Sequence, residues 1–95
     1  MEIKKVGVIG LGTMGAGIAQ VSAQSGYQVI ASEVNEALLA KGLANISASL
    51  GFEVRRRRLT QSDADAALAR IKGTTSFGDF AECDLVIEAA SESLA

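Results

Sequence analysis

Short apolar runs alternate along this chain with longer segments in which apolar residues are spaced as in a helix. Strands are predicted over residues 3–9, 28–32 and 84–89, whose nearly continuous apolar character is typical of strands buried in a parallel sheet. A shorter, threonine-rich strand is predicted over residues 72–76. The pattern therefore indicates a small parallel sheet with helical connections.

The first helix is predicted over residues 14–25, with Gly26 as its C-terminal stop. Helical spacing places Ile18, Val21 and Ser22 on its inward side.

Two further helices are predicted between the second and third strands. Asn35 is suited to cap the first of them. Gly51 is predicted to end its apolar pattern, which consists of Leu39, Leu43, Ile46 and Leu50. Thr60 begins the second, whose inward face is predicted to hold Ala64, Ala67, Leu68 and Ile71. A turn or brief helix is predicted over residues 77–82.

A glycine-rich turn joins the first strand to the first helix and consists of Gly10, Leu11, Gly12, Thr13, Met14 and Gly15. Gly10 permits a tight turn, Gly12 lets the backbone approach a pyrophosphate, and Gly15 lets the helix lie against the strand. Gly17 is expected to extend that close contact by one turn. The N–H groups at the start of the helix would face the phosphates, so this turn predicts a dinucleotide site.

Glu33 narrows the choice of dinucleotide. It lies at the end of the second predicted strand, 18 residues after Gly15, where a carboxylate can accept hydrogen bonds from both hydroxyls of a ribose. The same charge repels the 2′-phosphate of NADP, which favours NAD. The alternative is an exposed acid at a strand end.

These elements predict an α/β fold, a partial Rossmann (doubly wound) parallel sheet. The expected strand order is 3-2-1-4, with a helical hairpin inserted between strands two and three. Residues 1–95 are expected to form a single domain, about half of a six-stranded dinucleotide-binding domain. Strand four would then be an open apolar edge, which predicts self-association through that edge or a truncated chain.

The composition excludes some functions. A net charge of −2 argues against nucleic acid or an anionic membrane as partner. The chain has no histidine, so the commonest general acid–base of hydride-transfer enzymes is missing. A single cysteine, Cys83, is expected to be a buried structural thiol and fits a cytoplasmic protein, as does the lack of transmembrane-length runs and of a leader pattern.

Two charged groups allow two interpretations each. The arginine run at residues 55–58 is either a solvated helix end or a phosphate clamp. Glu88 and Glu92 flank the end of strand four as solvent-facing acids or as acid–base groups.

Three stretches of the chain, residues 5–20, 59–75 and 84–90, resemble the NAD-binding domain of 3-hydroxyacyl-CoA dehydrogenases, including the bacterial 3-hydroxybutyryl-CoA enzymes. The resemblance implies oxidation of a 3-hydroxyacyl-CoA to a 3-oxoacyl-CoA with NAD. It assigns the pyrophosphate to Gly10–Gly15, the adenosine ribose to Glu33, where the family usually has aspartate, and further cofactor contacts to Ala90 and Glu92. It also assigns CoA contacts to Ser49 and Arg56.

The resemblance also implies that the catalytic histidine and the substrate and dimerisation domain lie beyond the end of this chain. We therefore expect the chain to bind cofactor without efficient turnover. Two alternatives stay open. One is the cofactor domain of a 3-hydroxyisobutyrate or 6-phosphogluconate type dehydrogenase, which the hairpin segment at residues 51–71 argues against. The other is a non-catalytic nucleotide-binding module.

Overall fold

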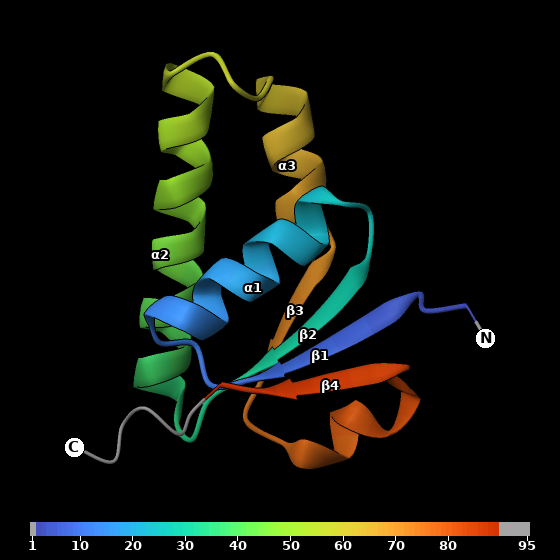
Figure 1. The fold of residues 1–95 in the computed structure, drawn as a ribbon. Helices are drawn as coiled ribbons and strands as arrows, with labels where there is room; N and C mark the ends of the chain where they lie inside the picture. The colour runs from blue at the N-terminus through green and yellow to red at the C-terminus, as the bar shows by residue number, and fades with distance from the viewer. Residues whose placement is uncertain (1, 90–95) are drawn as a thin grey trace.

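The computed structural model describes residues 2–89. Four parallel strands form one sheet in the order β3-β2-β1-β4 (Figure 1). Their bounds are Lys5–Ile9 for β1, Gln28–Ser32 for β2, Ile71–Thr74 for β3 and Leu85–Glu88 for β4. The predicted α/β fold and strand order are confirmed.

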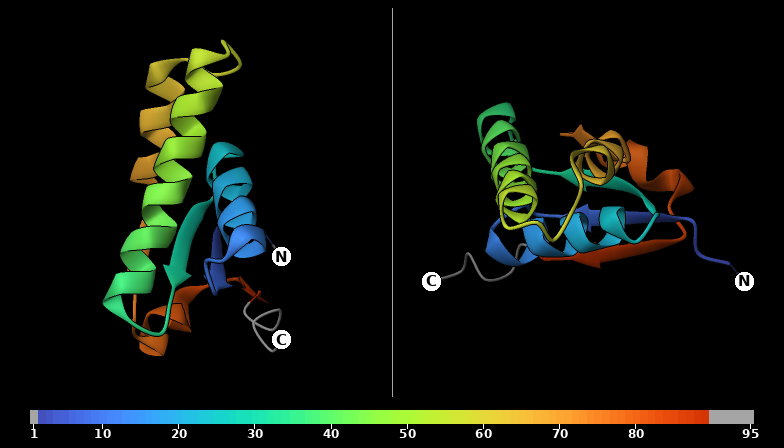
Figure 2. Two further views of the ribbon diagram at one scale, coloured as in Figure 1. Left: turned by 90° about the vertical axis from the view of Figure 1, so that its left-hand side faces the viewer. Right: turned by 90° about the horizontal axis from the view of Figure 1, so that it is seen from above.

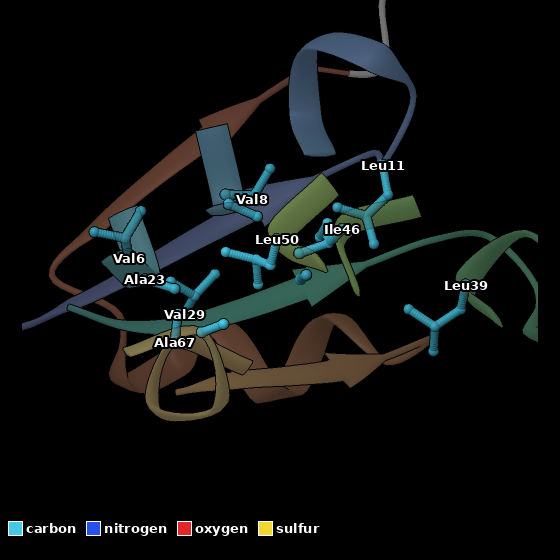
Figure 3. Packing of buried hydrophobic residues seen from close by; sticks show 12 residues of the cluster. Val6, Val8, Leu11, Ala23, Val29, Leu39, Ile46, Leu50 and Ala67 are labelled. Atoms are coloured by element: carbon cyan, nitrogen blue, oxygen red, sulfur yellow. The ribbon is translucent and has the colours of Figure 1, made fainter. Parts of the chain in front are cut away.

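Three α-helices and one 3-10 helix connect the strands. They are α1 (Thr13–Gln24), α2 (Glu36–Arg55), α3 (Gln61–Ala69) and the 3-10 helix η1 (Phe77–Glu82). The antiparallel pair α2 and α3 extends beyond the sheet as the predicted hairpin, and α1 crosses the sheet beside it (Figures 1 and 2). The core lies between these helices and the sheet, where Val8, Val29, Ile46 and Leu50 are the largest fully buried side chains (Figure 3).

Helix α1 packs on the sheet through small residues. Gly15, Ala19 and Ala23 are its buried positions, whereas Val21 is 63% exposed. The predicted inward face is therefore wrong at Val21, and Ile18 is only partly buried. The reason is distance: close contact between a helix backbone and β1 leaves room for hydrogen or methyl side chains and turns the larger ones outward.

Helix α2 begins where it was predicted and ends later. The Asn35 side chain accepts a hydrogen bond from the N–H of Leu38 at 2.8 Å, which confirms the cap. Gly51 does not interrupt the helix, which continues to Arg55. Burial of Ile46 and Leu50, worth about 1.5–3 kcal/mol for each such side chain, holds this part of the helix and outweighs the cost of one glycine, about 1 kcal/mol.

A Schellman motif ends α2 instead. The N–H of Arg57 donates to the carbonyl of Val54 at 3.0 Å, and that of Arg58 to the carbonyl of Glu53 at 2.9 Å. Arg57 has φ of 61°, the only positive value at a non-glycine residue in the part of the chain described. An arginine thus occupies the left-handed position that glycine usually takes.

Helix α3 begins as predicted, because the Thr60 hydroxyl accepts a hydrogen bond from the N–H of Asp63 at 3.0 Å. Ala64 and Ala67 are buried, but Ile71 belongs to β3 and not to the helix. The third strand therefore starts one residue before its predicted range and ends at Thr74.

Strand β4 lies at the edge of the sheet and pairs with β1. Leu85 and Val86 are each 43% exposed there, so the expected apolar edge is present. The carboxylate of Asp84 accepts hydrogen bonds from the N–H groups of Lys4 and Lys5 at 2.8 and 3.0 Å. These bonds lower the pKa of Asp84 and hold the start of β4 beside β1.

Replacing Arg57 with glycine is expected to stabilise the fold by about 0.5–1 kcal/mol, because glycine takes the left-handed conformation without the steric cost that arginine pays. The melting temperature should rise by a few degrees, measured by circular dichroism. Arg58→Gly is the control, since its φ is not positive and it should give no gain. Equal stability of R57G and the parent chain would contradict this account of the helix end.

Candidate functional site

The glycine-rich turn leaves β1 at the carboxyl end of the sheet. Gly10 has φ of 93°, which favours glycine, and its N–H donates to the carbonyl of Ser32 at 3.0 Å. This bond ties the turn to the end of β2. The chain can therefore reverse within two residues and enter α1 at Thr13.

The N-terminus of α1 is open to an anion. Its N-cap is Gly12, which offers no side-chain cap, and no acidic residue lies in the first turn. The first helical hydrogen bond runs from the N–H of Ala16 to the carbonyl of Gly12 at 2.9 Å. The preceding N–H groups, of Thr13, Met14 and Gly15, therefore have no acceptor within the helix. Such groups, together with the helix dipole, are suited to bind phosphate.

Gly15 sets how closely this helix start approaches the turn. A Cβ atom at Gly15 would collide with the carbonyl oxygen of Gly10 and touch the Ala89 Cβ at 3.4 Å. The predicted role of Gly15 therefore fits the structure. The expectation for Gly17 is wrong: a Cβ there would meet nothing within 4 Å, because Gly17 faces away from the sheet.

Glu33 lies directly beside the turn. One carboxylate oxygen accepts a hydrogen bond from the N–H of Leu11 at 2.6 Å, and the other accepts from the N–H of Val34 at 3.2 Å. The side chain is partly buried. These bonds hold a negative charge at the end of β2, next to the backbone that would carry the pyrophosphate. This is the position required of a ribose acceptor.

A cleft of about 500 Å³ opens between α1 and α2 above the turn. Leu11, Gly12 and Thr13 contribute from the turn, Glu33 from the end of β2, and Ser49 from α2. Four of the residues predicted to bind the cofactor therefore share one cleft with one of the two predicted CoA contacts, whereas Gly10, Met14 and Gly15 do not line it.

Several cleft residues were not found in the sequence analysis. They include Gln20 on α1, and Lys41 and Asn45 on α2. Lys41, Asn45 and Ser49 recur every four residues, a spacing that places polar side chains on one side of a helix. This spacing could have identified the polar side of the helix from the sequence, since the apolar residues of the same helix recur between these polar ones.

Arg56 lies beyond the cleft, at the C-cap of α2. Seven residues separate it from Ser49, which places both on the same side of the helix about 10 Å apart along its axis. In the arginine run, Arg58 pairs with Glu53 at 3.5 Å. Met14, the remaining predicted residue of the turn, is 52% exposed.

The other candidate residues have separate positions. Ala90 and Glu92 lie outside the described residues. Glu88 ends β4 and is exposed. Cys83 is half-buried rather than fully buried, and burial raises the pKa of its thiol. Its Sγ lies against Gly7 on the side of the sheet that carries Phe80 of η1.

Two further findings concern the described residues as a whole. Between residues 2 and 89, no three metal-ligating side chains come together. In the same part of the chain, none of the helices has the length and apolar character required to cross a membrane.

Comparison with known proteins relates this geometry to one family. Residues 5–95 match the family described as 3-hydroxyacyl-CoA dehydrogenase, NAD binding domain. The 3-hydroxybutyryl-CoA dehydrogenase of Bradyrhizobium diazoefficiens is 44% identical over 90 residues, which are 95% of this chain and 31% of that protein. The 3-hydroxyadipyl-CoA dehydrogenase of Escherichia coli is 42% identical, over 99% of this chain and 20% of that protein.

Solved structures agree. The crystal structure of (S)-3-hydroxybutyryl-CoA dehydrogenase from Ralstonia eutropha matches with a TM-score of 0.92 and 45% identity, covering 96% of this chain and 32% of that one. This chain thus spans about a third or less of the length of these relatives.

Replacing Gly15 with alanine is expected to abolish NAD binding, because the new methyl group forces the start of α1 away from the Gly10 carbonyl. The variant should also be less stable by about 1–3 kcal/mol, which is the typical cost of inserting a methyl group into a closely packed region. Gly51→Ala, inside α2 and away from the cleft, is the matched control, since a Cβ at Gly51 would make only an ordinary contact, 3.6 Å from Arg55. It should gain up to about 1 kcal/mol from helix propensity and keep the NAD-induced rise in melting temperature.

Thermal unfolding with and without NAD measures both effects. A G15A variant that unfolds and responds to NAD as the parent chain does would overturn this account of the turn.

Proposed function

Because the chain belongs to the family of 3-hydroxyacyl-CoA dehydrogenase NAD-binding domains, we propose that it serves as the cofactor domain of an enzyme that oxidises 3-hydroxyacyl-CoA to 3-oxoacyl-CoA. The observation that carries this proposal is the joint placement of the uncapped α1 N-terminus and the Glu33 carboxylate on the glycine turn. This chain by itself is proposed to bind NAD without efficient turnover, since it has no histidine to act as acid–base.

The chain's own residues bind and orient the cofactor. We assign the pyrophosphate to Gly10–Gly15, whose N–H groups at the start of α1 would offset its charge. Glu33 is assigned to the adenosine ribose, where its fixed charge also opposes a 2′-phosphate. Bound NAD supplies the hydride acceptor. Ala90 and Glu92 are proposed to complete the cofactor site on the nicotinamide side, by the resemblance alone.

The acyl-CoA substrate is proposed to lie along α2. Ser49 lines the cleft, and Arg56 follows two turns later on the same side of the helix. A hydroxyl and a guanidinium at this spacing suit an extended, phosphorylated ligand. The four-arginine run makes this end of the hairpin the most basic part of the chain.

Two other functions are less well supported. A dehydrogenase for free β-hydroxy acids, of the 3-hydroxyisobutyrate type, has no evident use for a 20-residue helix ending in arginines. It also predicts no binding of CoA. A non-catalytic nucleotide-binding module would share every site named here, and it predicts NAD binding without any turnover.

We further propose that residues 1–95 act as one domain, in the cytoplasm, and that the open β4 edge mediates self-association. The exposure of Leu85 and Val86 supports the last of these, since an unpaired apolar edge can add a strand from a second copy.

Replacing Glu33 with glutamine is expected to weaken NAD binding about 10- to 100-fold, because hydrogen bonds to a charged acceptor contribute about 1.5–3 kcal/mol. Isothermal titration calorimetry measures the Kd. Glu36→Gln, in the first turn of α2, is the control with the same loss of charge and should keep the parent Kd. Unchanged NAD affinity in E33Q would contradict the ribose assignment, and a parent chain that binds NAD but no CoA would favour the dehydrogenase for free β-hydroxy acids.

Self-association is tested by Val86→Lys, because a lysine on an edge strand opposes strand addition. In sedimentation experiments the parent chain should shift from monomer to dimer as its concentration rises, and V86K should remain monomeric. Val34→Lys, at a residue 80% exposed away from the sheet edge, is the control and should dimerise as the parent chain does. A parent chain that stays monomeric at every concentration would overturn the proposal.

A further inference from the structure

Helix α2 carries a continuous stripe of residues beside its core-facing side. The stripe consists of Lys41, Asn45, Ser49, Phe52 and Arg56, spaced by four, four, three and four residues. At 3.6 residues per turn these positions fall within an arc of about 80°. The first three line the cleft, and the last two continue beyond it toward the helix end.

Phe52 is an unusual member of this polar stripe. Phe52 is 44% exposed, whereas the core-facing residues Ile46 and Leu50 are each 1% exposed. The guanidinium carbon of Arg56 lies 5.4 Å from the centre of its ring, within the range of a cation–π contact. A large apolar ring is therefore held in place at the surface by a planar cation.

The charge around this pair is positive. Arg58 is paired with Glu53 at 3.5 Å, but Arg55, Arg56 and Arg57 form no ion pair within residues 2–89. The Arg56 guanidinium lies over the exposed ring, and Arg55 and Arg57, its neighbours in sequence, add two more unpaired guanidinium groups to the same end of α2. Aromatic rings and arginines together are the means by which proteins stack on bases and bind the phosphates attached to them.

We infer that Phe52 and Arg56 form a stacking platform for the adenine of CoA, with the neighbouring arginines facing the phosphates of its adenosine 3′,5′-bisphosphate end. This inference rests on the proposed CoA substrate. It adds Phe52 as a residue that recognises the nucleotide end of CoA. Phe52 lies 16 residues after the start of α2, about 24 Å along the axis from the end that follows Glu33. The platform is therefore separate from the adenosine site assigned to NAD.

The chain contains no tryptophan, so Phe52→Trp introduces a single reporter at the platform. CoA and adenosine 3′,5′-bisphosphate should quench its fluorescence saturably, because the base stacks on the indole. Pantetheine, which lacks the nucleotide, should not. Phe77→Trp, at a 70% exposed phenylalanine in η1, is the matched control and should respond to none of these ligands.

Affinity gives the second measurement. Phe52→Ala should raise the Kd for CoA about 5- to 100-fold, as loss of one base–aromatic stack does, and Phe52→Tyr should restore it. The Kd for NAD should not change in either variant, and their melting temperatures verify the fold. If CoA binds the parent chain and F52A equally, the platform is refuted while the proposed substrate stands. If the parent chain binds NAD but not CoA, the proposed substrate and the platform both fail.

Discussion

The structure depends on the contact between the start of α1 and the Gly10 carbonyl, which only a glycine at position 15 permits. This close approach has two consequences. It packs the small side of α1 against β1, so that Ala19 and Ala23 are fully buried. It also directs the unsatisfied N–H groups of the first turn toward the space above the sheet, where a phosphate can reach them. The same missing Cβ atom thus sets both the packing of α1 and the position of its first N–H groups.

Other close contacts extend this arrangement through the domain. A Cβ at Gly42 of α2 would lie 2.6 Å from the Cβ of Leu11, and one at Gly73 of β3 would lie 2.9 Å from Leu43. The first contact brings α2 onto the glycine turn and thereby closes one side of the cleft. The second seats the same helix on β3. Helix α2 therefore packs against both the glycine turn and the sheet, while the stripe from Lys41 to Arg56 is left beside these contacts.

The Glu33 carboxylate links the electrostatics of the site to its shape. Its bond to the Leu11 N–H at 2.6 Å connects the end of β2 with the turn after β1. Two adjacent strands are thereby joined at their carboxyl ends, where ligands of open α/β sheets bind. The charge lies close to the N-terminus of α1, and the positive end of the helix dipole stabilises it there.

Much of the fold and of the shape of the candidate site could be predicted from the sequence, because these features depend on residues that are close together along the chain. The glycine spacing, the caps at Asn35 and Thr60, and the strand order follow from local conformation and from connection rules. Only the tertiary structure decided that Val21 faces outward and that α2 continues through Gly51. Those outcomes depend on how closely a helix approaches the sheet and on which side chains it buries there. The pattern of residues within one element does not contain this information. The same holds for the cleft. Lys41, Glu33 and Ser49 line one cleft only because packing brings α2 over the turn.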